Sequence, residues 1–343
     1  MTHENGTPSG LSLLNLSLEE KFDSCCESIV NSENFCLTQK APGIFEFCPR
    51  NIETRSSTHH LTKVILSCGI HGNETAPIEI CESLSQAIIN ESIPCCRPLL
   101  LIFGNIDAIK ANRRFTTENL NRLFTKKPPK DSSAKNSETK RAQVIMAAVD
   151  EFANNANRVI HYDLHTAIRD SQFPLFTVEP VSELSQDNTF HYQLFDKLGI
   201  EANLKNHLPT HTFSRYTHTY FGAEAFTLEL GKVKPFGSNP VETQQKALMQ
   251  FSHLLSEMAL ILDSERDVSL SSFKIIHELT KRSENFKLHL DPKLPNFSNL
   301  PPGICVAEDD NYTYIPQSDD EYIVFPNPNV AVGQRAGLIV SPN

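Results

Sequence analysis

The sequence predicts an α/β fold, with a mixed, mostly parallel sheet flanked by helices and a smaller all-β domain at its C-terminal end. Apolar, β-branched runs at residues 63–68 and 98–103 are typical of buried strands. Between them, residues 77–88 place apolar side chains at helical spacing behind a proline, which the first turn of a helix tolerates. This order of strand, helix and strand indicates a βαβ unit of a parallel sheet.

The rest of the chain continues this alternation up to about residue 266. Helical spacing recurs at 142–152, 190–198 and 242–262, and short apolar strands are expected at 159–165, 173–178 and 225–231. Beyond about residue 267 the sequence changes to short β-type runs separated by Pro, Asn and Asp. Such a pattern is typical of a small all-β domain.

The first 60 residues carry less pattern, with a short helix expected around residues 16–30 and a strand around 43–47. At 343 residues the chain exceeds one average domain. We therefore expect an irregular or β-structured N-terminal extension over 1–60, a catalytic α/β domain over 61–266 and a β domain beside the active site over 267–343.

A candidate metal site follows the strand at residues 63–68. The chain there enters a glycine-flanked loop that presents His71 and Glu74, three residues apart. A catalytic zinc takes three protein ligands and leaves a position for water, so a third ligand should come from elsewhere. The best source is the apolar run at 159–165, where Asp163 and His165 lie two apart and share a face of the strand. We favour His165 as the ligand and Asp163 as its supporting carboxylate.

Two further segments carry candidate functional residues. Glu229 lies inside the apolar run at 225–231, where a carboxylate is costly unless it is paired or functional. The segment from Asn105 to Arg122 is rich in arginine and asparagine and directly follows a predicted strand. A solvated loop would also have this composition, but arginine's planar fork binds carboxylates in bidentate fashion. The position at the strand end favours a binding segment for an anionic substrate.

Composition excludes several other classes of protein. A formal net charge of −10 argues against nucleic-acid binding, which requires a basic face. No apolar run approaches the roughly 18 residues of a membrane span, and the N-terminus lacks the pattern of a signal peptide. Nine cysteines, an odd number without a Cys-x-x-Cys pair, suggest reduced thiols rather than a disulfide framework. We expect a cytoplasmic protein.

The motifs together resemble the succinylglutamate desuccinylase/aspartoacylase family of metallocarboxypeptidase-like deacylases. The resemblance rests on residues 69–77, on Gly104-Asn105, and on the segments 118–122, 163–166 and 229–231, whose order and separations match the family. The ending at 322–340 is similar to the desuccinylase branch in particular. The resemblance covers nearly the whole chain and implies a zinc-carboxypeptidase-like fold.

The resemblance also implies a set of roles and a reaction. One Zn²⁺ per subunit would be held by His71, Glu74 and His165, with Glu229 as general base, Arg114 polarising the scissile carbonyl, and Asn121 and Arg122 gripping a substrate carboxylate. Arg215, Tyr216 and Tyr312 are further candidates that no motif fixes, Arg215 for substrate binding. The implied reaction is hydrolysis of N-succinyl-L-glutamate to succinate and L-glutamate, the last step of the succinyltransferase route of arginine degradation.

Without the resemblance, the residues indicate only a zinc amidohydrolase that acts on a small anionic substrate. An aspartoacylase-like or other N-acyl amino-acid deacylase is the first alternative, and a peptidase is the next. A non-catalytic protein that binds zinc or carboxylates is an alternative of another class. A homo-oligomer is possible under each of these interpretations.

Overall fold

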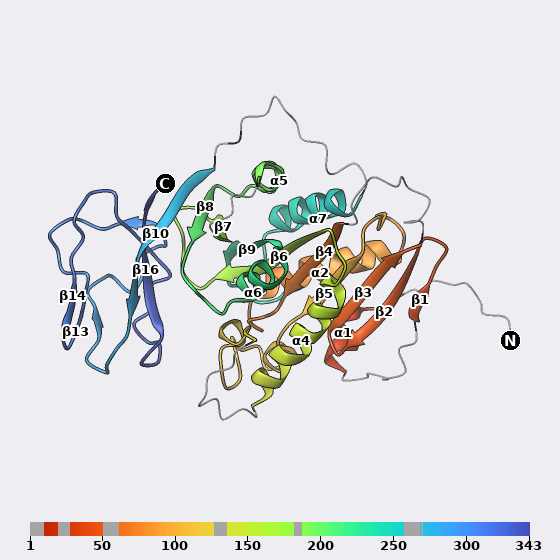
Figure 1. The fold of residues 1–343 in the computed structure, drawn as a ribbon, viewed down its shortest axis with the longest axis horizontal. Coiled ribbons are helices and arrows are strands. Elements are labelled where there is room, and N and C mark those ends of the chain that lie inside the picture. The colour runs from red at the N-terminus through yellow and green to blue at the C-terminus, as the bar shows by residue number, and fades with distance from the viewer. Residues whose placement is uncertain are drawn as a thin grey trace.

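The computed structural model describes residues 10–19, 28–50, 62–126, 136–181, 187–256, 268 and 270–343. Their main element is a mixed sheet of 13 strands with helices against both faces, and a second sheet of three strands lies near the C-terminal end (Figure 1). The predicted fold class is therefore confirmed. The predicted domain boundaries, near residues 60 and 266, both fall outside the described residues.

Four parallel strands form the centre of the large sheet. They are β5 (Leu99–Phe103), β4 (Thr62–Cys68), β6 (Arg158–Ala167) and β9 (Glu224–Lys232), adjacent in that order. These strands are almost fully buried, as their apolar sequences predict. Their carboxyl ends meet at one edge of the sheet, which is where α/β proteins commonly bind ligands.

Helices form a separate apolar core on each face of the sheet. One core contains α2 (Thr75–Ile89), α5 (Thr189–Leu198) and α7 (Val241–Leu255) together with Val64 and Leu66 of β4. The other contains α4 (Ser137–Ala153) and α6 (Phe213–Phe221) with Ile65 of the same strand. Successive strand residues thus point to opposite cores. The helix predicted over 242–262 ends at Leu255, and residues 257–262 lie outside the described residues.

The N-terminal residues extend one edge of the sheet. Strands β1 (Ser28–Asn31), β2 (Phe35–Ala41) and β3 (Ile44–Pro49) are antiparallel to one another, and β3 pairs with β5. The strand expected around 43–47 is confirmed as β3. The helix expected around 16–30 is wrong at its C-terminal end, because Val30 pairs with Leu37 in the sheet. Helix α1 covers Leu13–Leu18, and residues 20–27 lie outside the described residues.

At the other edge the sheet continues without a break into the C-terminal region. Strand β9 is followed across the sheet by β7 (Leu175–Pro180), β8 (Ala202–Asn206), β10 (Ser271–Thr280), β16 (Arg335–Pro342), β15 (Tyr322–Val324) and β12 (Ser298–Asn299). The three-stranded sheet contains β11 (Lys287–Leu288), β13 (Ala307–Asp309) and β14 (Tyr312–Tyr314). The C-terminal region is thus joined to the central strands through the parallel pair of β8 and β10.

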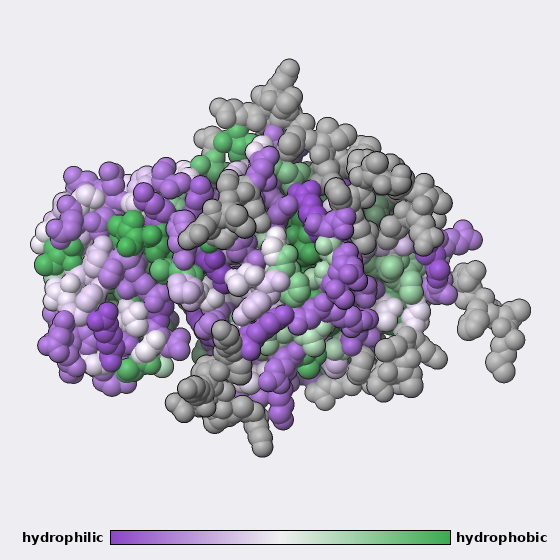
Figure 2. Space-filling model, in the orientation of Figure 1, coloured by the Kyte–Doolittle hydropathy of each residue, from purple (hydrophilic) through white to green (hydrophobic). Residues whose placement is uncertain are grey.

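The described surface is mainly hydrophilic on the face that Figure 2 draws, with exposed hydrophobic residues in small separate patches. No described helix is both long enough and apolar enough to span a bilayer. The seven cysteines in the described ranges are not joined by disulfide bonds.

Candidate active site

The loop after β4 is held in place by close backbone contacts with the next strand end. Gly69 adopts a positive φ of 63°, and its carbonyl accepts the Asn105 N–H at 2.8 Å. A Cβ added at Gly72 would lie 2.1 Å from the backbone of Ala108 in α3 (Ile106–Lys110), so only glycine fits there. The glycines of the motif therefore let two loops pack together at the sheet edge.

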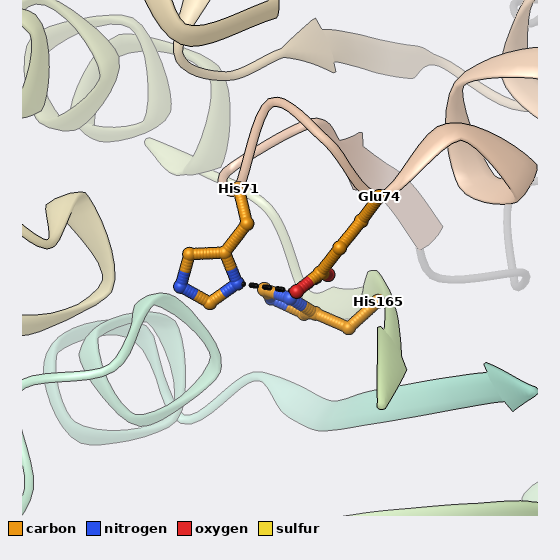
Figure 3. A group of neighbouring side chains, drawn as sticks. All are labelled: His71, Glu74 and His165. Atoms are coloured by element: carbon orange, nitrogen blue, oxygen red, sulfur yellow. Dashed lines mark hydrogen bonds and ion pairs between the residues drawn. The ribbon is translucent and has the colours of Figure 1, made fainter. Parts of the chain in front are cut away.

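His71, Glu74 and His165 converge at this edge (Figure 3). The Nδ1 atoms of His71 and His165 each lie 2.8 Å from a different oxygen of the Glu74 carboxylate. All three side chains are buried, and their ligand atoms lie within 4.8 Å of one another. The backbone N–H of Thr166 also donates to Glu74, at 3.0 Å. The structure thus brings together the three predicted ligands from the β4 loop and from β6.

The outer nitrogens of both imidazoles have acceptors that fix the tautomers. Nε2 of His165 lies 3.0 Å from the Asp163 carboxylate, which can only accept while it is ionised. Nε2 of His71 lies 3.0 Å from Oδ1 of Asn119, an atom that also accepts the backbone N–H of Asn121. Each ring can therefore donate from Nε2, which directs Nδ1 toward Glu74.

This arrangement fits a metal cation. Two imidazole nitrogens that face one carboxylate need a positive charge between them, either a proton on His165 or a metal cation. Nitrogen and oxygen donors of this kind suit a divalent transition metal. The His-Glu-His triad can therefore hold a metal ion. A second group, His289, Cys305 and Glu308, is partly exposed, and the Lys287 ammonium lies 3.1 Å from Glu308 and would compete with a cation.

The charges of the triad are strongly coupled. Burial lowers the pKa of His71 to about 4, with repulsion from Arg114 acting in the same direction. Burial also opposes the charged form of His165, but the carboxylates of Asp163 and Glu74 outweigh it and raise the pKa of His165 well above its usual value. The two histidines in turn hold the pKa of Glu74 well below its usual range. The site thus stabilises a positive charge at its centre.

A buried polar chain extends behind His165. The second oxygen of Asp163 accepts the Ser67 hydroxyl at 2.6 Å. Ser67 also lies 2.9 Å from Nε2 of His161, whose Nδ1 lies 2.8 Å from the hydroxyl of Thr217 in α6. All five side chains are buried. The chain links β4, β6 and α6, and it holds the supporting carboxylate in one orientation.

Glu229 lies on the strand next to His165. The two residues are register partners in the parallel pair of β6 and β9, so their side chains share a face of the sheet. Oε2 of Glu229 is buried and has no hydrogen-bond partner among the described residues. Burial raises the pKa of Glu229 to about 7, although His165 and Arg114 lower it. A carboxylate that titrates near neutral pH is suited to proton transfer.

The arginine-rich segment lies against the triad. Arg114 donates to Oε1 of Glu74 at 2.7 Å, and its side chain remains 31% exposed. The segment is fastened by Glu138 at the start of α4, whose Oε1 accepts the backbone N–H groups of Thr116 at 2.7 Å and Thr117 at 3.1 Å. These hydrogen bonds lower the pKa of Glu138 to about 2, against the effect of its burial.

Asn121 and Arg122 lie in the short 3₁₀ turn Leu120–Arg122. Nδ2 of Asn121 lies 3.4 Å from the His165 ring, while its Oδ1 accepts the backbone N–H of Phe213 at 2.9 Å. Arg122 donates to the Asn121 carbonyl at 2.8 Å. Asn121 therefore lies beside the triad, and Arg122 follows it in the same turn. The resemblance implies that a substrate carboxylate binds to this pair.

The structure does not bring the less certain candidates to the triad. Arg215 donates to the carbonyls of Val181, at 3.0 Å, and Asn206, which occupy two of its nitrogens. Tyr216 donates to Asp150 of α4 at 2.5 Å. Tyr312 contacts His277 at 2.5 Å within the C-terminal region. Their expected roles stay predictions.

Sequence reasoning missed four residues of this region: Asn119, Glu138, Glu278 and Arg335. Asn119 and Glu138 act through hydrogen bonds to residues far along the chain, and only the structure reveals such contacts. Arg335 and Glu278 come from the C-terminal strands β16 and β10 and interact electrostatically with Arg122. The stretch 322–340 that contains Arg335 is part of the resemblance, but the sequence gives no sign of its electrostatic link to Arg122.

The fold and the site together define an α/β protein with a carboxypeptidase-like candidate metal site at the carboxyl ends of its parallel strands. The family model of the succinylglutamate desuccinylase/aspartoacylase catalytic domain matches residues 60–255. The model of the barrel-sandwich hybrid domain of the same family matches residues 268–343. The chain belongs to the succinylglutamate desuccinylase/aspartoacylase family.

Curated relatives and solved structures agree with this assignment. A succinylglutamate desuccinylase from Pseudoalteromonas atlantica is 39% identical over 88% of this chain and 85% of its own length. The crystal structure of the succinylglutamate desuccinylase from Chromobacterium violaceum superposes with a TM-score of 0.80 at 33% identity, covering 97% of this chain and 98% of that one. Murine aminoacylase 3, at 17% identity and a TM-score of 0.57, shares the fold.

Proposed function

We propose that this protein is a zinc-dependent amidohydrolase that converts N-succinyl-L-glutamate to succinate and L-glutamate. The observation that carries the proposal is the buried His-Glu-His triad with Glu229 on the adjacent strand. Desuccinylase relatives that align over 81–88% of the chain support the choice of substrate. In the succinyltransferase route of arginine degradation, this hydrolysis would be the last step and would release L-glutamate.

Zinc would be bound by Nδ1 of His71, Nδ1 of His165 and the carboxylate of Glu74. Three such ligands leave one position open, which is typical of catalytic rather than structural zinc. When bound, the metal supplies Lewis acidity, which lowers the pKa of a coordinated water and polarises a carbonyl group. Asp163 and Asn119 keep both imidazoles in the tautomer that this binding requires.

Glu229 would act as the general base and then as the general acid. Its carboxylate takes a proton from the attacking water and later gives that proton to the nitrogen of the leaving glutamate. Its pKa of about 7 supports both steps, because the group can gain and lose a proton near neutral pH. The unpartnered Oε2 is free to bind the water.

The arginine-rich segment would bind the substrate and the developing oxyanion. Arg114 is fixed to Glu74 by one nitrogen, so its charge lies beside the position that the scissile carbonyl must occupy. A fixed donor there stabilises the tetrahedral intermediate more than the substrate. Asn121 and Arg122 would grip a carboxylate of the substrate, which would hold the amide bond near Glu229.

Other N-acyl amino acids, as in an aspartoacylase-like enzyme, are the nearest alternative substrates, and peptides are the next. A non-catalytic zinc or carboxylate-binding protein would not require a base of raised pKa beside the triad. A cytoplasmic location and a homo-oligomeric state stay predictions from the sequence.

The test is amine release by zinc-loaded protein from N-succinylglutamate, N-acetylaspartate and a dipeptide, measured side by side. Turnover of the succinyl compound above the other two is the expected result. Preference for N-acetylaspartate or the dipeptide would retain the mechanism and overturn the assigned substrate. Absence of turnover with all three, while zinc is bound, would favour the non-catalytic alternative.

A further inference from the structure

The loop that follows the strand of the general base is attached to the helix that follows a metal ligand. This loop covers residues 233–240, between β9 and α7. Glu229 lies near the carboxyl end of β9, and Glu74 is the residue directly before α2. The attachment therefore joins the two parts of the chain whose side chains must act together in the proposed reaction.

Thr75, the residue next to Glu74, makes the first part of this attachment. Its hydroxyl donates to the backbone carbonyl of Lys234 at 2.7 Å. The same oxygen accepts Nδ2 of Asn239 at 2.8 Å. Both Thr75 and Asn239 are buried. One hydroxyl thus uses its donor and its acceptor on opposite ends of the same loop.

Glu79, one turn further along α2, makes the second part. Its Oε1 accepts the backbone N–H of Gly237 at 2.5 Å. Its Oε2 accepts Nδ2 of Asn239 at 3.0 Å and Nε2 of Gln244, in the first turn of α7, at 2.5 Å. Hydrogen bonds to an ionised carboxylate are stronger than those between neutral groups. Thr75 and Glu79 together form an anchor for the loop.

The start of the loop is also bound to the strand of His165. The N–H of Val233 donates to the carbonyl of Ala167 at 3.0 Å. Upstream, Glu229 and His165 are register partners in the same pair of strands. The sheet thus orients the base relative to one metal ligand, and the loop anchor ties the same stretch of chain to the helix that follows another.

We propose that Thr75 and Glu79 are positioning residues, which hold the general base in place relative to the metal ligands by anchoring the loop at 233–240 to α2. They act through Glu229 and are neither ligand nor base themselves. The inference rests on the proposed function. A reacting group that is misplaced by about 1 Å can cost about 10²-fold in rate, so an anchor beside the base has a catalytic effect as well as a structural one.

The test compares Glu79→Ala with the matched control Glu82→Ala. Glu82 also lies on α2, but it accepts the backbone N–H of Leu14 at 2.9 Å and so ties the helix to α1. Each variant removes the carboxylate acceptor of one distant backbone N–H, and the two should lose similar stability. Only Glu79→Ala should lower kcat, by about 10-fold, with KM and zinc content near wild type. Glu79→Gln retains an acceptor oxygen and should recover most of this loss.

Thr75→Val and Thr75→Ser give a second comparison that keeps Glu79 in place. Valine has nearly the shape of threonine but cannot donate to the Lys234 carbonyl, whereas serine retains the hydroxyl. We expect kcat of Thr75→Val to be about 10-fold below that of Thr75→Ser. Equal kcat values within both comparisons, or losses that appear only in KM, would overturn the positioning role.

Limited proteolysis separates this inference from the proposed function. Phe236 is 45% exposed in the middle of the loop, and chymotrypsin cleaves after such a residue. We expect cleavage after Phe236 to be about 10-fold faster in Glu79→Ala than in Glu82→Ala, because the loop opens more often without its anchor. Equal cleavage rates would contradict the anchor, whatever the turnover. Faster cleavage together with an inactive wild type would assign the failure to the proposed function instead.

Discussion

The metal half and the substrate half of the candidate site differ in how their polar groups are paired. Every ring nitrogen and carboxylate oxygen of His71, Glu74 and His165 has a described partner within about 3 Å. On the substrate side, Oε2 of Glu229 has no hydrogen-bond partner among the described residues. The fold thus completes the metal half by itself, and it leaves a buried acceptor on the substrate side that a bound water or substrate can satisfy.

After substitution of the general base, the largest effect should come from the oxyanion donor, which lies where the two halves meet. We expect Arg114→Met to lower kcat by about 10²- to 10³-fold, because a fixed cation near the developing charge is lost. Steady-state kinetics with zinc-loaded protein measure this change in kcat. A loss confined to KM would show instead that Arg114 binds substrate and transition state equally.

Zinc binding can be weakened by a substitution that leaves all three proposed ligands in place. Asp163→Asn removes the carboxylate that holds the His165 tautomer, and we expect about 10- to 100-fold weaker zinc binding. Competition with a chelator gives the affinity. Ser67→Ala should weaken binding less, since Asp163 keeps its contact with His165. Unchanged affinity in Asp163→Asn would contradict the assigned role.

The pH dependence of activity should report the substrate half. Glu229 must be ionised to accept a proton, so kcat/KM should fall tenfold per pH unit below its pKa in the active enzyme. Burial raises that pKa to about 7, and a bound metal cation lowers it toward the usual 4.5. The acid limb should therefore lie between these two values. An acid limb below pH 4 would show that Glu229 is not the group that titrates.

The same raised pKa predicts a stability cost in the metal-free protein. The folded protein holds the Glu229 proton more tightly than the unfolded chain, so the stabilisation that this proton provides is present below pH 4.5 and lost as pH rises through about 7. Glu229→Gln should thus unfold at a higher temperature than wild type at pH 8, with a gain of about 1–3 kcal/mol, and show no gain at pH 4.5. If Glu229→Gln and wild type had the same melting temperature at pH 8 as well as at pH 4.5, this cost would be excluded.

The smallest effect should come from the clamp on the arginine-rich segment. Glu138→Ala leaves the N–H groups of Thr116 and Thr117 without their acceptor and should cost about 1–3 kcal/mol of stability. Because Arg114 and Asn119 flank the clamped residues, kcat should fall as well. Glu138→Gln retains an acceptor oxygen and should recover most of the activity. Equal kcat values for the two variants would contradict this explanation.

The sequence predicted the parts of this site that depend on local order. His71, Glu74 and His165 could be found because each follows or ends an apolar strand, and strand ends in a parallel sheet converge. Glu229 could be found because a carboxylate inside an apolar run is unusual. The same alternation of strands and helices predicted that the centre of the sheet is mostly parallel.

The parts that sequence could not predict depend on contacts between distant residues. Asn119 and Glu138 are ordinary polar residues in polar segments, and only the fold places them beside their partners. The helix expected over 16–30 is wrong at its C-terminal end because Val30 finds a strand partner in Leu37, a tertiary preference that local periodicity does not contain. The continuation of the sheet into the C-terminal strands likewise depends on the pairing of β8 with β10.

The most direct test of the account is a paired measurement on Glu229→Gln. Zinc content per chain and turnover of N-succinylglutamate would be determined on the same sample. Because the metal half is complete without Glu229, we expect one zinc per chain and a kcat about 10²- to 10⁴-fold below wild type. Full turnover with zinc bound would contradict the role of Glu229, and loss of zinc would contradict the independence of the two halves.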